Sequence, residues 1–247
     1  MVVADERSPD LLGLGHATGV VQRTVQSLLG RRLIIGADRL DPSKGLLERF
    51  RAYQNFLEDY PEQRGHVTYL QLAPLGRQSV RAYSQIRDAL EQSSGRTNGR
   101  FADADWTPVR YLNRNYPHAT LMGFLRAAQV CLVTPLRDGM NLVAKEFVAA
   151  QNPDDPGVLV LSNMAGAARE LTDALLVNPY DTKGIARAFH SALVMPLAER
   201  RARHERLLAI LRENDVHRWH MRFLEQLTCE SPTSSVPAVS SVVSGSV

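Results

Sequence analysis

A short polar segment, residues 138–142, combines a carboxylate, a glycine and a run of backbone amides. Asp138 offers hydrogen-bond acceptors, and Gly139 lets the main chain approach a ligand closely. The amides of Met140, Asn141 and Leu142 would stand at the start of a helix, where free N–H groups and the helix dipole favour an anion. The segment predicts a site for phosphate or sugar hydroxyls, although Asp138 taken alone is more typical of a helix cap.

Two cations lie in a second polar segment, residues 38–45. Arg39 carries a planar guanidinium that can bind paired phosphate oxygens, and Lys44 supplies a point charge. Together they could neutralise a diphosphate leaving group. An arbitrary Arg–Lys pair is more often a solvated surface feature, so the residue types alone leave both interpretations open.

Both segments resemble one known family. Residues 138–151, Asp-Gly-Met-Asn-Leu-Val-Ala-Lys-Glu-Phe-Val-Ala-Ala-Gln, are similar to the donor-sugar motif of the trehalose-6-phosphate synthases, which use a nucleotide-activated glucose. Residues 38–45 resemble a second motif of this family, but Pro42 stands where the family usually carries tyrosine. Proline fixes φ, so a stiffer turn is expected. The resemblance is collinear and runs from about Gly36 to about Leu227.

The resemblance implies a retaining glycosyltransferase that transfers glucose from UDP-glucose to glucose 6-phosphate, giving trehalose 6-phosphate and UDP. Arg39, Lys44 and Asp138 would be its catalytic residues. The two cations would stabilise the departing diphosphate, and Asp138 would bind glucose hydroxyls. Because the cations take over the role of a divalent ion, the resemblance implies that no metal and no other cofactor is required.

The resemblance also implies roles for further residues. The backbone from Gly139 to Leu142 would help to hold the glucose, and Glu146 would accept hydrogen bonds from the ribose hydroxyls. Tyr116 and Leu121 lie where the uracil pocket should be, and Arg77 is similar in position to an arginine that contacts the acceptor's phosphate. Judged by residue type alone, Arg77 could equally be a surface charge, and Tyr116 and Leu121 could equally be core residues.

Apolar, strand-like segments alternate with amphipathic, helical ones along the chain. This alternation predicts an α/β fold: a Rossmann-like, mostly parallel sheet with helices on both faces and ligands at the carboxyl ends of the strands. The resemblance implies, more specifically, the C-terminal domain of a GT-B glycosyltransferase. The predicted strands are Leu33–Ala37, Val67–Leu72, Val109–Leu112, Val130–Thr134, Val158–Leu161 and Leu175–Val177. Helices are predicted at Val20–Leu29, from Leu46 onward, and at Ile185–Met195, Leu197–Arg212 and Val216–Leu227.

The chain has 247 residues, of which 44% are hydrophobic and 22% charged, as is ordinary for a soluble globular protein. Residues 31–227 are predicted to form the nucleotide-sugar-binding domain with its terminal helices. Residues 1–30 are interpreted as an N-terminal extension or linker. Residues 228–247, rich in Ser, Val and Pro, are interpreted as a disordered tail.

Charge and cysteine content exclude several classes of protein. The net charge is +3, and the basic residues are spread without a compact run, which argues against a nucleic-acid partner. Neither of the two cysteines belongs to a Cys-x-x-Cys pattern, which favours a reducing compartment. No apolar stretch reaches the roughly 18 residues that a membrane span needs. We therefore expect a cytoplasmic protein that does not contact a membrane.

The sequence matches only the second half of such a synthase, because the family's amino-terminal domain, which carries much of the acceptor-sugar site, has no counterpart in it. A synthase is the leading hypothesis, with a separate chain carrying that domain, or a homo-oligomer, as partner. The alternative is a non-catalytic UDP-sugar-binding module or an incomplete copy of the enzyme. Another GT-B enzyme with a different nucleotide or acceptor is a third hypothesis.

Overall fold

The computed structural model describes residues 19–75, 81–214, 218, 220, 221, 224 and 225. Its strands are β1 (Arg32–Ala37), β2 (Val67–Leu72), β3 (Val109–Leu112), β4 (Val130–Val133), β5 (Val158–Ser162) and β6 (Leu175–Val177). Its helices are α2 (Gly19–Gln26), α3 (Leu46–Asp59), α4 (Arg81–Phe101), α5 (His118–Ala127), α6 (Leu142–Ala150), α7 (Thr182–Val194) and α8 (Leu197–Glu213). Short 3-10 helices are η1 (Pro42–Lys44), η2 (Pro61–Gln63) and η3 (Gly166–Arg169).

The strands form one six-stranded sheet in the order β3-β2-β1-β4-β5-β6, and every pair is parallel. Gly36 of β1 lies between Gln71 of β2 and Leu132 of β4. All the predicted strands are present, and their limits agree to within one residue. The alternation of strands and helices thus predicted the fold class correctly, because parallel neighbours require helical crossovers.

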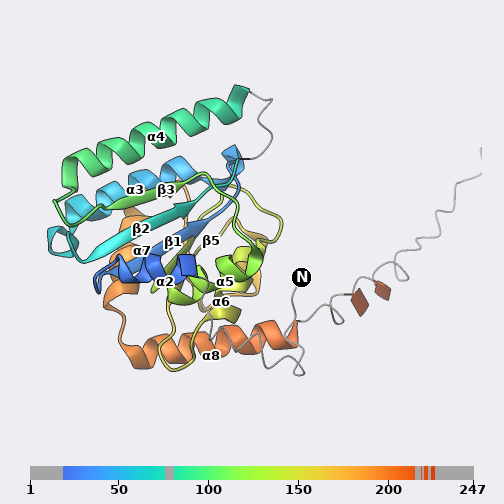
Figure 1. The fold of residues 1–247 in the computed structure, drawn as a ribbon. Helices are drawn as coiled ribbons and strands as arrows, with labels where there is room; N and C mark the ends of the chain where they lie inside the picture. Colours follow the sequence, from blue (N-terminus) through green and yellow to red (C-terminus); the bar gives the residue numbers. More distant parts are fainter. Residues whose placement is uncertain (1–18, 76–80, 215–217, 219, 222–223, 226–247) are drawn as a thin grey trace, which may run out of the picture.

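Both faces of the sheet are buried under helices (Figure 1). Leu33 and Ile35 of β1 point into a core formed with α2, α5, α6 and α8, whereas Ile34 points into a second core formed with α3, α4 and α7. Successive strand residues face opposite sides, so a strand covered on both faces is apolar throughout, as β4 and residues 33–37 of β1 are.

The strand order reverses between β1 and β4. The chain runs outward from β1 through β2 to β3, then crosses through α5 to β4 on the other side of β1. In such sheets the loops that leave the two central strands diverge to opposite faces, and a crevice opens at their carboxyl ends. The loops with the sequence motifs, residues 38–45 and 134–141, leave β1 and β4 at this point.

The predicted helices near residues 20–29, 46, 185–195 and 197–212 correspond to α2, α3, α7 and α8. Most of the predicted helix Val216–Leu227 lies outside the described residues, as do residues 1–18 of the predicted extension and the whole of the predicted tail, 228–247. Among the helices that the structure describes, none combines the length and the apolar character needed to cross a bilayer. The cytoplasmic location stays a prediction.

Candidate functional site

A cleft of about 570 Å³ opens at the carboxyl ends of β1, β2 and β4. Its walls come from the loops that follow β1, β2, β3 and β4, from α5 and from the beginning of α6. Many residues that the sequence singled out line it together: Arg39, Lys44, Tyr116, Leu121, Asp138, Met140, Asn141 and Leu142. Positions separated by about a hundred residues therefore share one cavity at the switch point of the sheet.

The loop after β1 is shaped by a cap and a glycine. Asp41 accepts hydrogen bonds from the amide and the hydroxyl of Ser43, at 2.8 and 2.7 Å, and so begins η1. Pro42 occupies the first position of η1, where a missing N–H costs nothing. Gly45, with φ +63°, then turns the chain into α3. This turn carries Lys44 to the cleft, and Arg39 is exposed beside it.

The loop after β4 ends in a side-chain cap of α6. Asn141, not Asp138, is this cap: its Oδ1 accepts from the amide of Ala144 at 3.1 Å. Asn141 adopts φ +81°, a left-handed conformation that asparagine tolerates better than most residues. Its Nδ2 donates to Asp138 Oδ2 at 3.0 Å. The helix-cap interpretation of Asp138 is therefore wrong, and its carboxylate is directed to the cleft instead.

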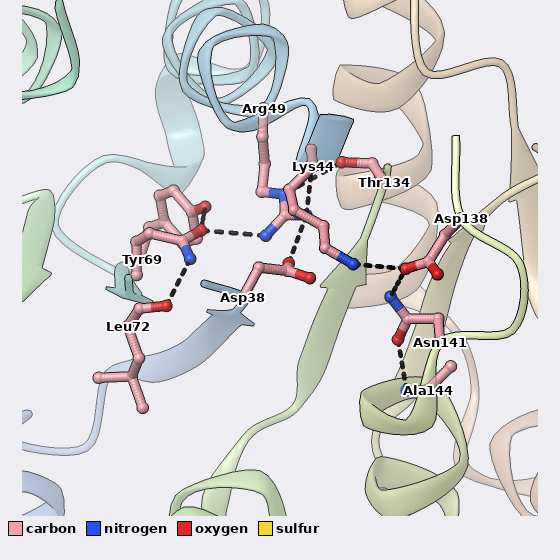
Figure 2. Close-up of polar contacts among 10 residues, drawn as sticks. Asp38, Lys44, Arg49, Tyr69, Leu72, Thr134, Asp138, Asn141 and Ala144 are labelled. Atoms are coloured by element: carbon pink, nitrogen blue, oxygen red, sulfur yellow. Dashed lines mark hydrogen bonds and ion pairs between the residues drawn. The ribbon is translucent and has the colours of Figure 1, made fainter. Parts of the chain in front are cut away.

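Lys44 and Asp138 form an ion pair that joins the two loops. Lys44 Nζ lies 2.6 Å from Asp138 Oδ2, a contact drawn in Figure 2. Both side chains are largely buried. The amide of Met140 also donates to Asp138 Oδ1, at 3.5 Å. Partial burial alone would raise the pKa of Asp138, but the hydrogen bond and charge of Lys44 outweigh it, and the pKa lies below its ordinary value. Asp138 is thus an anion at neutral pH.

This lowered pKa predicts how stability depends on pH. A carboxylate whose pKa is lower in the folded than in the unfolded state stabilises the fold above the unfolded value of 3.8, and this contribution is lost as the pH falls through the folded value. We expect Asp138→Asn to lower the free energy of unfolding by about 1 kcal/mol near neutral pH, less than the roughly 1.5–3 kcal/mol usual for a charged hydrogen bond, because the pair is partly exposed.

Urea unfolding of the unmodified chain and of Asp138→Asn, compared from about pH 7 down to about pH 3, measures this difference. The difference should stay constant down to about pH 5 and shrink below it. A difference that is as large in acid as at neutral pH would show that the ion pair is not its source.

The remaining predicted site residues are placed less centrally. Tyr116 and Leu121 line the cleft, but both also pack partly against the core, and the Tyr116 ring meets Phe124 edge-on at 5.4 Å. Gly139 is exposed. Glu146 is absent from the cleft lining, and its Oε1 lies 3.1 Å from His118 Nε2. Arg77 lies outside the described residues.

Several residues of the cleft were not predicted. Arg114 and Asn115 line it directly after β3, and Ala37, Leu72 and Pro74 add an apolar wall. Arg114 follows the carboxyl end of a predicted strand, and this position is the sequence signal that could have predicted its place in the cleft. Asp38 also lines the cleft and pairs with a buried arginine, Arg49. The signal for Arg49 is its spacing, because it stands on the apolar stripe of α3 with Leu46, Phe50 and Tyr53.

The charges of the cleft favour an anion. Arg39 and Arg114 are exposed, and within the described part of the chain the side chain of Arg39 makes no hydrogen bond or ion pair. Asp38 is balanced by Arg49 and Asp138 by Lys44. In the residues that the structure describes, no group of three or more His, Cys, Asp or Glu side chains could hold a metal ion.

Comparison with known proteins gives one consistent result. The model of glycosyltransferase family 20 matches residues 18–229. A trehalose-6-phosphate synthase of Sodalis glossinidius is 54% identical over 214 residues, which are 87% of this chain and 45% of that protein. A trehalose-6-phosphate synthase of Klebsiella pneumoniae is 57% identical over 201 residues, 81% of this chain and 42% of that protein.

The solved structures that resemble this chain belong to the same class of protein as its sequence relatives. The chain superposes with a TM-score of 0.86 and 52% identity on an alpha,alpha-trehalose-phosphate synthase (UDP-forming) from Burkholderia xenovorans in complex with glucose-6-phosphate, covering 89% of this chain and 48% of that one. An Escherichia coli protein bound with UDP-2-fluoro glucose gives a TM-score of 0.82 at 49% identity, covering 85% of this chain and 47% of that one. The chain spans about half the length of the relatives it matches.

Proposed function

Because this chain belongs to glycosyltransferase family 20 and has the fold of the C-terminal domain of a GT-B enzyme, we propose that it is the donor-binding part of an alpha,alpha-trehalose-phosphate synthase (UDP-forming). Such an enzyme transfers glucose from UDP-glucose to glucose 6-phosphate. The observation that carries the proposal is the meeting of Arg39, Lys44 and Asp138 in one cleft where the strand order reverses.

The two cations would bind the diphosphate of UDP-glucose. Arg39 is exposed and can present two parallel N–H groups to phosphate oxygens. Lys44 carries three N–H donors, so it can keep its bond to Asp138 while it donates to a phosphate oxygen. Negative charge grows on the diphosphate as the glycosidic bond breaks, and cations fixed beforehand stabilise that charge without reorganising. In this proposal no metal ion is needed.

Asp138 would bind the glucose. Its Oδ2 is occupied by Lys44 and Asn141, whereas its Oδ1 receives, from the residues that the structure describes, only the long bond from the amide of Met140. A sugar hydroxyl could donate to Oδ1 without breaking the ion pair. The exposed backbone at Gly139 and the cleft residues Met140 to Leu142 would pack beside it.

The base and the ribose would occupy the other end of the cleft. Tyr116 and Leu121, with Ala37, Leu72 and Pro74, give an apolar wall suited to a flat ring. Glu146 pairs with His118 outside the cleft lining, so its proposed role at the ribose hydroxyls rests on the family resemblance. Arg77 keeps its proposed role at the acceptor's phosphate from the family resemblance alone.

A second candidate function is supported by how much of each relative's length aligns with this chain. Between 42% and 49% of the first curated relatives aligns with this chain, so a non-catalytic module that binds UDP-sugars is the alternative. Transfer requires both substrates to be held within reacting distance, and losing one wall of the cleft would forfeit much of the rate gained by alignment. Binding of the donor does not require that wall to the same degree.

Release of UDP in the presence of UDP-glucose and glucose 6-phosphate distinguishes a catalytic synthase from a non-catalytic module. We expect the purified chain alone to release UDP only at the rate of UDP-glucose hydrolysis. Adding the amino-terminal half of the Klebsiella relative, produced separately, should raise the rate at least about 100-fold. The same mixture with Arg39→Ala is the control. A chain that binds UDP-glucose but gives no turnover in the mixture would support the module instead.

A further inference from the structure

Arg49 is an unusual residue to find on the buried face of α3. Its side chain is completely buried and is the bulkiest of the fully buried side chains in the described part of the protein. Arginine is seldom buried unless it is paired, because removing its charge from water is costly. A side chain in such a place must be held by acceptors on several sides.

Its acceptors come from the ends of β1, β2 and β4 and from the η1 turn (Figure 2). Arg49 Nη2 donates to Asp38 Oδ2 at 2.9 Å, directly after β1, and Nε donates to Thr134 Oγ1 at 3.0 Å, directly after β4. Nη1 donates to Gln71 Oε1 of β2 at 3.0 Å. A longer bond, 3.4 Å, joins Nη2 to the carbonyl oxygen of Lys44 itself. One guanidinium thus connects three strands with the η1 turn.

The acceptors are themselves fixed. Gln71 uses its Oε1 for Arg49 and the hydroxyl of Tyr69, while its Nε2 donates to the carbonyl oxygen of Leu72 at 2.9 Å. Burial raises the pKa of Asp38, and the neighbouring guanidinium counteracts part of that rise. The guanidinium therefore has little freedom to move without breaking several buried hydrogen bonds.

The backbone is built to admit this contact. A Cβ on Gly36 of β1 would lie 2.6 Å from Arg49 Nη1 and 2.4 Å from Gln71 Oε1, closer than atoms can approach. A Cβ on Gly45 would lie 2.4 Å from the carbonyl oxygen of Thr134. Both glycines let the η1 turn and the guanidinium lie against the ends of β1 and β4. These close contacts are independent of the hydrogen bonds and indicate the same compact arrangement.

Three of the four acceptors of Arg49 lie on the segments that carry the proposed diphosphate site. Asp38 directly precedes Arg39, the carbonyl oxygen belongs to Lys44 itself, and Thr134 begins the loop, residues 134–141, that carries Asp138. We propose that Arg49 is a positioning residue that sets the spacing of Arg39, Lys44 and Asp138 for the diphosphate. This inference rests on the proposed function, because it deepens the role of the same cleft.

Stability alone does not explain an arginine here. Replacing a buried ion pair by apolar residues of similar volume is often neutral or stabilising, since no charge then has to leave water. An apolar residue at position 49 would continue the stripe formed by Leu46, Phe50 and Tyr53. What it could not do is hold three strand ends and a turn at fixed separations through directional hydrogen bonds.

The test compares UDP with UMP, which keeps the base, the ribose and one phosphate. In Arg49→Lys the charge remains but the forked geometry is lost, so we expect the preference for UDP over UMP, measured by calorimetry, to fall at least about tenfold. Arg51→Lys is the matched control, because Arg51 lies on the same helix, exposed at its surface, and should leave the preference unchanged. Equal losses for UDP and UMP would overturn the positioning role.

Two further arms keep the test decisive. If Arg49→Lys does not fold, the double variant Asp38→Asn with Arg49→Met removes both buried charges and should fold, with the same loss of preference. Amide hydrogen exchange needs no ligand: Arg49→Lys should speed exchange at residues 41–45 and 136–139 and leave β5 unchanged. Faster exchange throughout the sheet would overturn the inference. An unmodified chain that binds no UDP would refute the proposed function, and exchange would still decide the role of Arg49.

Discussion

Replacing Arg39 and Lys44 together by alanine is expected to lower the affinity for UDP at least about 100-fold. A hydrogen bond to a charged group contributes about 1.5–3 kcal/mol, which corresponds to roughly a tenfold to a hundredfold change in affinity for each cation. The loss of Lys44 has a second effect, because it leaves the carboxylate of Asp138 unpaired beside the phosphates. Repulsion between like charges should then make Lys44→Ala the more damaging single change.

The fold should survive these changes. Arg39 is exposed, and Lys44 lies in a turn whose shape depends on Asp41, Ser43 and Gly45. Calorimetric titration with UDP measures the loss, and circular dichroism verifies the fold. The matched control is the double variant Lys183→Ala with Arg187→Ala, which removes the same two charges from α7, where they pair with exposed Asp59 and Asp181. If the cleft variant bound UDP as the control does, the assignment of both cations would be refuted.

Gly45→Ala should give a large loss of stability. The residue has φ +63°, where an alanine costs about 1–2 kcal/mol, and its Cβ would lie 2.4 Å from the carbonyl oxygen of Thr134. That oxygen belongs to the backbone at the end of β4, so it cannot rotate away. We expect the free energy of unfolding to fall by about 3 kcal/mol, and the melting temperature by about 6–12 °C.

A second glycine, Gly65, separates the cost of the positive φ from the cost of the close contact. It has φ +77°, but a Cβ there would meet no atom within 4 Å. Gly65→Ala should therefore cost only the backbone strain, about 1–2 kcal/mol. The difference between the two variants, measured by urea unfolding, reports the contact with Thr134. Equal losses would mean that the η1 turn does not press against the end of β4.

The sequence predicted the sheet well because its strands are short apolar segments in regular alternation with helices. Leu33 to Ala37 and Val130 to Val133 are apolar on both faces, and only a parallel sheet covered by helices buries both faces in this way. The carboxyl ends of the strands also predicted where the motif residues meet. The periodicity of apolar residues could not predict which side chains of separate loops pair with each other, because this pairing depends on the tertiary fold.

Asp138 and Arg49 illustrate that limit. Asp138 precedes a helix, and its spacing is typical of a cap, but Asn141 takes that position and leaves Asp138 to pair with Lys44, far away in the sequence. The residue type of Arg49 is typical of a surface charge, whereas its spacing places it on the apolar face of α3. Its acceptors come from the ends of three separate strands. These contacts depend on how the strands are ordered, which no local pattern contains.

Titration of the unmodified chain with UDP-glucose by calorimetry, in buffer that contains a chelator, tests the central claim most directly. Each phosphorus of UDP-glucose carries one ester and shares one anhydride bond, so each has a single, strongly acidic group that does not change its charge near neutral pH. We predict saturable binding of one UDP-glucose per chain, unchanged when the chelator is replaced by magnesium. A correctly folded chain that binds no UDP-glucose, or binds it only with the metal present, would contradict the assignment of Arg39 and Lys44 as the groups that hold the diphosphate.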